Sequence, residues 1–85
     1  MRNMLRRDRA QAHLTGARVS ALMRQRGMSL SSLAGKVGIQ RSTLENFCAG
    51  RRIPSELLSG IARELDTSVA YLLDMSDDPG VAPVR

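Results

Sequence analysis

Between positions 40 and 46 the sequence gathers polar side chains that can hydrogen-bond to the edges of DNA bases. An arginine can donate two hydrogen bonds to guanine, an asparagine can pair with an adenine edge, and a glutamate can accept from cytosine. Each good pair is worth roughly 1–3 kcal/mol of discrimination against a wrong base. For two of the five residues, Gln40 and Glu45, a solvated surface position is the alternative, and Glu45 could instead orient Arg41 or Arg52. The residues with this hydrogen-bonding chemistry are Gln40, Arg41, Ser42, Glu45 and Asn46.

A second polar set has the chemistry for contacts to phosphate. Hydroxyl groups and the free amides of a helix N-terminus hydrogen-bond to anions, and arginine adds positive charge. Such contacts position a duplex without reading its sequence. The residues of this set are Ser29, Ser31, Thr43, Arg51 and Arg52.

No residue pattern indicates catalysis. His13 has no second ligand nearby in the sequence that would make a metal site, so we expect an exposed polar side chain. The serines lack a base partner, and no glycine-rich phosphate loop is present. Cys48 is predicted to be a buried thiol on the apolar side of its helix. We therefore predict a protein that is not an enzyme and that needs no cofactor and no metal.

Two short helices, joined at a glycine, must position these polar side chains. The spacing of the apolar residues predicts helices over 30–37 and 41–48 that pack across one another. Ser29 is a good N-cap for the first of them, whereas Gln40 is a poor one for the second. Gly38 can adopt the left-handed conformation that ends a helix. The apolar positions that would form the contact are Leu33, Ala34, Val37, Ile39 and Leu44.

Three further helices complete an all-α domain of five helices. The sequence predicts a helix over 16–26 with Thr15 as N-cap and with Arg18 facing solvent, a helix over 56–65 after Pro54, and a short one over 68–74. Residues 15–74 then form the folded domain. Residues 1–14 are predicted to form a basic arm that is flexible or a frayed helix, which either contacts DNA or only aids solubility. Residues 75–85, rich in Asp, Pro and Gly, are predicted to form a disordered tail.

Charge is unevenly distributed along the chain. Residues 1–53 carry eleven Lys and Arg against two acidic residues, whereas residues 54–85 carry two against six. A basic surface on one side is the electrostatic footprint of a nucleic-acid binder, although charge alone also fits an ordinary solvated face. The 85 residues allow only one small core, which association with a second copy would help to stabilise. No membrane span or secretory signal is visible, and the single cysteine fits a reducing cytoplasm.

A set of residues keeps the order and spacing of a known family across about two thirds of the chain. These are Val19, Leu22, Ser29, Leu33, Ala34, Val37, Gly38, Ile39, Ser42, Thr43, Leu44, Gly50, Pro54, Ser55, Ala62, Leu65, Ser68, Leu72 and Leu73. From Gly16 to Leu73 the chain therefore resembles the lambda-repressor-like helix-turn-helix family of the Cro/cI or Xre type. Members are mostly sequence-specific transcription regulators, often homodimers on operators with two half-sites. The resemblance implies that Arg41, Ser42 and Asn46 face the bases of the major groove, with Gln40 and Glu45 nearby.

The chain departs from this family at several positions. Members commonly pair an arginine on the first helix with a glutamate at the end of the third, and these positions are Met23 and Cys48 here. Because both partners are replaced together, no charge is left buried alone, and we predict that the two side chains touch in the core. Leu30 and Ala49 replace polar residues that often reach the DNA backbone, so the phosphate contacts must come from the other residues named above.

These observations predict a cytoplasmic DNA-binding transcriptional regulator, expected to be a repressor, that binds a double-stranded operator as a homodimer. The helix over 68–74 with Tyr71 and the loop around Ile53 are the candidate dimer surfaces. The alternative is a protein-interaction module such as an antitoxin, for which DNA binding is secondary. In that case the acidic segment 75–85 is the expected contact for a regulatory protein partner.

Overall fold

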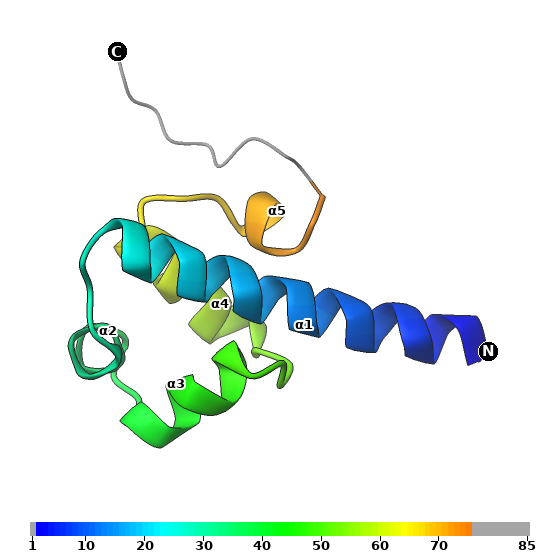
Figure 1. Cartoon of the computed structure of the whole chain (residues 1–85), viewed down its shortest axis with the longest axis horizontal. Coiled ribbons are helices and arrows are strands. Elements are labelled where there is room, and N and C mark those ends of the chain that lie inside the picture. The colour runs from blue at the N-terminus through cyan, green and yellow to red at the C-terminus, as the bar shows by residue number, and fades with distance from the viewer. Residues whose placement is uncertain (1, 76–85) are drawn as a thin grey trace, which may run out of the picture.

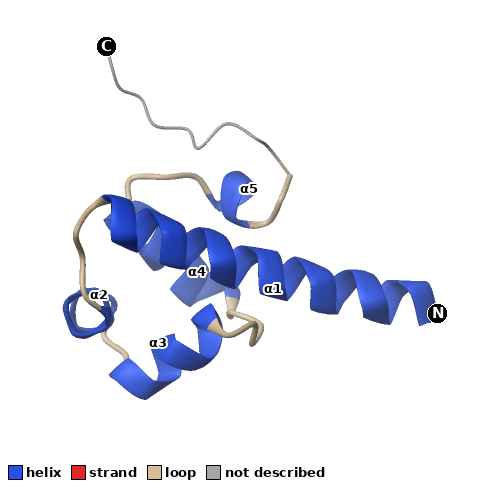
Figure 2. Ribbon diagram, viewed as in Figure 1, coloured by secondary structure: helices blue, strands red, loops and turns tan. Residues whose placement is uncertain are grey.

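The longest element is a first helix that runs along the full length of the molecule (Figure 1). A computed structural model describes residues 2–75, with the backbone alone for residues 2–8. Within this part of the chain five helices follow one another, and no described residue forms a strand (Figure 2). The predicted all-α fold is confirmed. The helices are α1 (Arg2–Gln25), α2 (Leu30–Val37), α3 (Arg41–Cys48), α4 (Ser55–Glu64) and α5 (Val69–Leu72).

The helices α2 and α3 form the predicted pair joined at a glycine. Gly38 ends α2 with a φ of 85°, a left-handed conformation that glycine adopts without steric cost. The N–H groups of Gly38 and Ile39 both donate to the Ala34 carbonyl, at 2.8 and 2.9 Å. At the other end of α2, the Ser29 hydroxyl accepts a hydrogen bond from a backbone N–H in the first turn at 3.0 Å. These end contacts fix the turn between the two helices.

The core is built from aliphatic side chains that come from every helix. α1 contacts α3 on one side and α5 on the other, and α4 contacts α2 and α5. Helices of four to ten residues are marginal alone in water, so this shared interior stabilises them. The largest fully buried side chains are Val19, Leu33, Leu44, Ile61, Leu65 and Leu72.

The predicted start of the first helix is wrong. α1 begins at Arg2, so residues 2–14, the predicted arm, continue this helix, and Thr15 is not its N-cap. Thr15 is 4% exposed, and its hydroxyl donates to the Leu72 carbonyl of α5 at 2.5 Å. Gly16 lies at the contact with α3, where a Cβ atom would be 2.5 Å from the Phe47 carbonyl oxygen. Thr15 followed by Gly16 has the local pattern of a helix start. Both residues instead lie inside α1, where Thr15 bonds to α5 and Gly16 contacts α3.

The last two helices lie close to their predicted positions. α4 begins at Ser55, directly after Pro54, and ends at Glu64, one residue earlier at each end than predicted. α5 is shorter than predicted, and its N-cap Ser68 accepts a hydrogen bond from the Tyr71 N–H at 3.0 Å. The predicted tail lies outside the described residues, apart from its first residue. Among the described helices, none combines the length and the apolar character that crossing a membrane requires.

Candidate nucleic-acid interface

One face of α3 presents the residues predicted to contact bases. Gln40, Arg41, Ser42, Glu45 and Asn46 are all exposed, and they follow one another along the N-terminal turn of α3 and the turn after it. The opposite face of the helix is buried through Leu44 and Phe47. The 3.6-residue period of the helix therefore separates an apolar side that holds α3 in place from a polar side open to a ligand.

Arg41 and Glu45 form an ion pair on this exposed face. The guanidinium Nη2 lies 3.6 Å from Glu45 Oε2, at the i, i+4 spacing, and the two side chains are 61% and 50% exposed. An exposed pair of this kind contributes at most about 1 kcal/mol to stability. The contact is one that Glu45 would make if it orients Arg41, and because the pair is weak, the guanidinium can exchange Glu45 for a stronger partner.

The N-terminus of α3 is open as well. Gln40 occupies the N-cap position with an extended backbone, and its side chain makes no capping hydrogen bond, as the sequence indicated. The first backbone bond inside the helix is from the Leu44 N–H to the Gln40 carbonyl, so the three preceding amides have no helical partner. Thr43, which the sequence predicts to contact phosphate, lies in this first turn of α3 and is half-buried.

Two serines lie at the start of α2, and both are exposed. The Ser29 oxygen accepts the capping hydrogen bond from the Ser32 N–H, which leaves the hydroxyl proton available for an external acceptor. Ser31 lies in the first turn, where the helix dipole favours an anion. The structure thus brings Ser29 and Ser31 to one helix N-terminus, which is the geometry expected for phosphate contacts.

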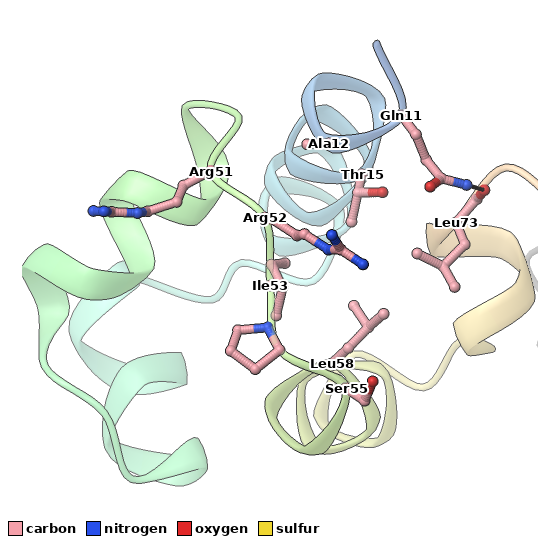
Figure 3. A pocket seen from close by; sticks show the side chains of 10 residues that line it. Gln11, Ala12, Thr15, Arg51, Arg52, Ile53, Ser55, Leu58 and Leu73 are labelled. Atoms are coloured by element: carbon pink, nitrogen blue, oxygen red, sulfur yellow. Dashed lines mark hydrogen bonds between the residues drawn. The ribbon is translucent and has the colours of Figure 1, made fainter. Parts of the chain in front are cut away.

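The two adjacent arginines after α3 point in opposite directions. Figure 3 shows Arg51 leaving the loop on the side of α3, whereas Arg52 points into a hollow on the other side. This hollow has a volume of about 290 Å³ and lies between α1, the start of α4 and the end of α5, with Thr15, Leu58 and Leu73 among its lining residues. Both arginines are exposed and both line this hollow, but only the Arg51 side chain is directed toward the ribbon of α3.

Close backbone contact with α1 sets the position of α3. At Gly16 an added Cβ atom would lie 2.5 Å from the carbonyl oxygen of Phe47 and 2.7 Å from that of Cys48. His13, one turn earlier in α1, is exposed as predicted, and its ring packs against Gly50, which has a φ of 115°. The C-terminal end of α3 is therefore fixed against residues of α1 that lie at and just before the predicted start of this helix.

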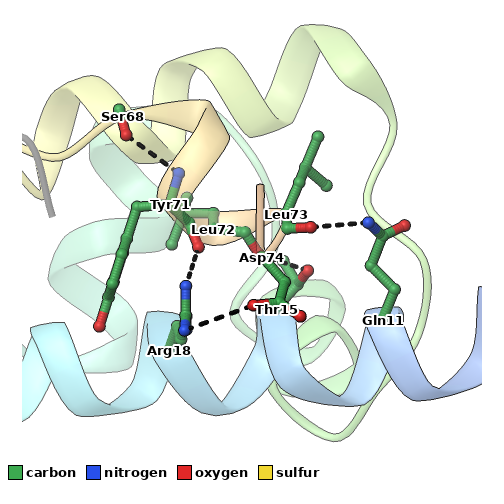
Figure 4. Close-up of polar contacts among 8 residues, drawn as sticks. All are labelled: Gln11, Thr15, Arg18, Ser68, Tyr71, Leu72, Leu73 and Asp74. Carbon is green, nitrogen blue, oxygen red and sulfur yellow. Dashed lines mark hydrogen bonds and ion pairs between the residues drawn. The ribbon is translucent and has the colours of Figure 1, made fainter. Parts of the chain in front are cut away.

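A second polar cluster, on the α5 side of α1, was missed by the sequence reasoning. Gln11 donates to the Leu73 carbonyl at 2.7 Å, and Arg18, predicted to face solvent, donates to the Tyr71 carbonyl and lies 3.6 Å from Asp74 Oδ1 (Figure 4). The Arg18 guanidinium also stacks 4.1 Å from the centroid of the Tyr71 ring. With Thr15, these side chains satisfy the last carbonyls of α5. The spacing 11, 15, 18 is the only sequence signal, since it places the three side chains on one face of a helix.

The prediction for Cys48 is only partly correct. The thiol is half-buried, not buried, and packs at the edge of the core. With Met23 it lines an open hollow of about 290 Å³, whose other lining residues include Met28, Leu30 and Glu45. Met23 itself is 6% exposed. The predicted pair of positions therefore faces one apolar hollow between α1 and α3, while direct contact between the two side chains stays a prediction.

Two residues of the candidate dimer surfaces already make contacts within the same chain. Ile53 is buried, and the Tyr71 ring is covered on one face by Arg18. Among the described residues no group of three His, Cys, Asp or Glu side chains is placed to hold a metal ion.

The fold and this exposed face together define the class of the protein: a small helical domain that presents a helix-turn-helix to a ligand. A family model described as the Cro/C1-type HTH DNA-binding domain matches residues 18–78, most of the chain. The chain belongs to this family of DNA-binding domains, whose members are typically regulators and not enzymes. The resemblance found in the sequence is thereby confirmed.

A solved structure of the SinR protein/SinI protein complex contains a similar chain. The two chains are 33% identical with a TM-score of 0.65, and the match covers 69% of this chain and 59% of that one. This chain thus spans little more than half the length of that relative. A search of curated proteins gave no match.

Proposed function

We propose that this protein is a sequence-specific transcriptional regulator, acting as a repressor, that inserts α3 into the major groove of its operator. The observation that carries this proposal is the polar face of α3, whose side chains are exposed and whose only recorded side-chain interaction is the weak Arg41–Glu45 pair. An α-helix fits the major groove, where each base pair presents a distinct pattern of donors and acceptors.

Base reading is assigned to the exposed face of α3. Arg41 releases Glu45 and donates two hydrogen bonds to guanine O6 and N7, which is worth roughly 1–3 kcal/mol of discrimination. Ser42 and Asn46 lie on the same face, and Asn46 has the donor and acceptor that pair with adenine. Glu45, freed from Arg41, can accept from cytosine N4, and Gln40 lies at the edge of this set.

Phosphate contacts are assigned to the elements on either side of α3. Ser29 and Ser31 offer hydroxyl groups and helix amides at the start of α2, and Arg51 offers a charge beyond the end of α3. Thr43 contributes from the first turn of α3. Arg52, which points into the hollow beside α5, has the weakest support in this set.

The regulator acts as a homodimer on an operator with two half-sites. Two copies related by a two-fold axis place their α3 helices in successive major grooves about one helical turn apart. Pairing doubles the number of base contacts, which raises the ratio of specific to non-specific binding. A dimer that occupies a promoter excludes the transcription machinery from it, and this is the basis of the proposed repression.

Titration against fluorescent DNA tests this function. The purified chain is added to duplex from the region upstream of its own gene and to unrelated duplex of equal length, at two salt concentrations. A preference of at least about 10³ for the upstream duplex supports a specific regulator. Equal and strongly salt-dependent binding to both duplexes contradicts sequence-specific regulation, and no binding at physiological salt contradicts DNA binding altogether.

A second candidate function is control through a protein partner, as in an antitoxin or a regulator held by an inhibitor. The similar solved chain belongs to a complex between two proteins, SinR and SinI, which favours a partner here as well. Deleting residues 75–85 separates the two functions. A DNA reader keeps its affinity for the operator after this deletion, whereas a module that binds a partner through this segment loses the partner.

A further inference from the structure

The N-terminal end of α1 extends past the rest of the molecule. Among residues 9–75, whose side chains the structure describes, α1 first contacts another element through a side chain at Gln11, and Arg9 and Ala10 before it are exposed. Residues 2–10 of α1 precede this contact. Nine helical residues span about 14 Å at the usual rise. Figure 1 shows this end of α1 projecting beyond α3 and the loop that follows it.

The register of α1 is fixed by contacts on its two sides. His13 and Gly16 face the C-terminal end of α3, at Gly50 and Phe47. Gln11, Thr15 and Arg18 face α5 on the opposite side. Because residues three and four apart share a face of a helix, the α3-facing side continues toward the N-terminus through positions 9, 6 and 2.

All three of these positions are arginines. Arg9 is exposed, and Arg6 and Arg2 occupy the same face by register. The one acidic residue of this segment, Asp8, is four residues before Ala12 and seven before Thr15, which places it with the α5-facing positions by register. The α3-facing side of the extension therefore carries three arginines, with Leu5 beside them by register, and it continues a line through His13 to the same end of α3 as Arg51.

The depth of the major groove makes this side reachable by DNA. Packed helix axes lie 8–10 Å apart, so α1 stands about that far behind α3. The major groove is about 8.5 Å deep. When α3 lies at the floor of the groove, the phosphates that border the groove therefore stand beside α3, at a similar distance above that floor. A helix one layer behind α3 that projects past its end is then level with the phosphate ridge, within reach of an arginine side chain.

We propose that the projecting end of α1 is a second DNA-contact site, in which Arg9, with Arg6 and Arg2 on the same face, binds the phosphate backbone that borders the groove entered by α3. This inference rests on the proposed function, because it needs α3 to lie in the groove. The contact adds affinity and anchors the end of α3, and it carries no sequence preference of its own.

The salt dependence of binding tests this site. Wild-type protein, the R9Q variant, the R6Q/R9Q variant and the R63Q control are titrated with the preferred duplex from 50 to 200 mM salt, following the logic of counterion release. Arg63 is exposed on α4, which carries none of the candidate DNA contacts, so R63Q removes the same charge away from the interface. Glutamine preserves helix propensity in every variant.

The expected result is a loss of about 0.9 per subunit, about 1.8 for the dimer, from the slope of log affinity against log salt for R9Q, and up to twice that loss for the double variant. R63Q keeps the wild-type slope, and all variants keep the wild-type base preference. Phosphate ethylation in turn identifies backbone positions outside the groove that block wild-type protein but not R6Q/R9Q.

Two results would overturn the inference. If R6Q/R9Q binds with the wild-type slope while wild-type protein still selects its duplex, the second site is wrong and the reading by α3 stands. If the wild-type protein selects no duplex, the proposed function fails and this site fails with it. Helical content measured by circular dichroism shows that the variants remain folded.

Discussion

The polar residues on the α5-facing side of α1 and those on the exposed face of α3 are used in different ways. On the α5 side, Gln11, Thr15 and Arg18 direct their polar groups at carbonyls of the same chain (Figure 4). On the exposed face of α3, the polar side chains make a single interaction among the described residues, the ion pair between Arg41 and Glu45. One set closes the ends of a helix within the protein, and the other leaves its hydrogen-bonding capacity for a ligand.

This difference teaches that residue type alone does not identify a functional site. Arginine occurs in both sets, and Arg18 stacks on Tyr71 and pairs with Asp74 while Arg41 stays largely exposed. A buried polar group must find its partner inside the protein, because leaving it unpaired is costly. An exposed polar group can remain hydrogen-bonded to water until DNA binds, at little cost to stability.

The largest effect is expected where α1 meets α3. Replacing Gly16 with alanine places a Cβ atom 2.5 Å from a backbone oxygen of α3, so the two helices must move apart. We expect a loss of about 3 kcal/mol in the free energy of unfolding, at the upper end for overpacking. Urea denaturation of Gly16→Ala measures it.

Gly35 in α2 offers the matched control for this substitution. A Cβ atom there has no neighbour within 4 Å, so Gly35→Ala should gain about 0.5–1 kcal/mol through helix propensity. Similar stability changes in the two variants would refute the close contact between α1 and α3.

A smaller loss is expected on the α5 side. Thr15→Val keeps the shape of the side chain but removes the donor to the buried Leu72 carbonyl, which should cost about 1–3 kcal/mol. Thr15→Ser keeps the hydroxyl and loses a methyl group. Thermal and urea unfolding should rank the serine variant above the valine variant. The reverse order would mean that packing of the Thr15 side chain, and not its hydrogen bond to Leu72, stabilises the contact between α1 and α5.

At the hollow shared by Met23 and Cys48 we expect an intermediate effect. Cys48→Glu brings a carboxylate to a half-buried position beside Glu45, with no cation among the residues that line the hollow. The loss should be about 1–2 kcal/mol, whereas Cys48→Ala should stay close to wild type. Equal melting temperatures for Cys48→Glu and wild type would argue against the assignment of these positions to the ion pair of the family.

The smallest effects on stability are expected at the two arginines after α3. Arg51→Ala and Arg52→Ala should each change the unfolding free energy by less than about 0.5 kcal/mol, since both side chains are exposed. In DNA binding they should differ. Arg51→Ala should lower the salt slope by about 0.9 per subunit for every sequence, whereas Arg52→Ala should change it less, because the Arg52 side chain points away from α3. A change of preferred base in either variant would contradict their assignment to phosphate.

The local signals in the sequence were sufficient for the helix-turn-helix. Ser29, Gly38 and the apolar spacing between them act within a few residues, and the structure has the cap, the left-handed glycine and the buried Leu33 where they were predicted. The exposed face of α3 follows from the same period. These features depend on hydrogen bonds and periodicity that a single helix contains.

The sequence failed where contacts join residues far apart. Thr15 and Gly16 have the local form of a helix start, and only α5 and the end of α3, more than thirty residues away, reveal why they lie inside α1. Arg18 was predicted to face solvent for the same reason, because its partners Tyr71, in α5, and Asp74, in the turn after it, lie 53 or more residues later. Local propensity cannot identify a partner that only tertiary packing supplies.

The most direct test of the claim that the exposed face of α3 reads DNA is the base preference of the wild-type protein and of Arg41→Ala, measured by selecting bound duplexes from a random pool. The account predicts a symmetric motif of two half-sites for the wild type. It also predicts that Arg41→Ala loses a guanine at one position of each half-site while its unfolding free energy stays within about 0.5 kcal/mol of wild type. An unchanged motif in Arg41→Ala, or no motif for the wild type, would contradict the claim that the unpartnered face of α3 reads DNA.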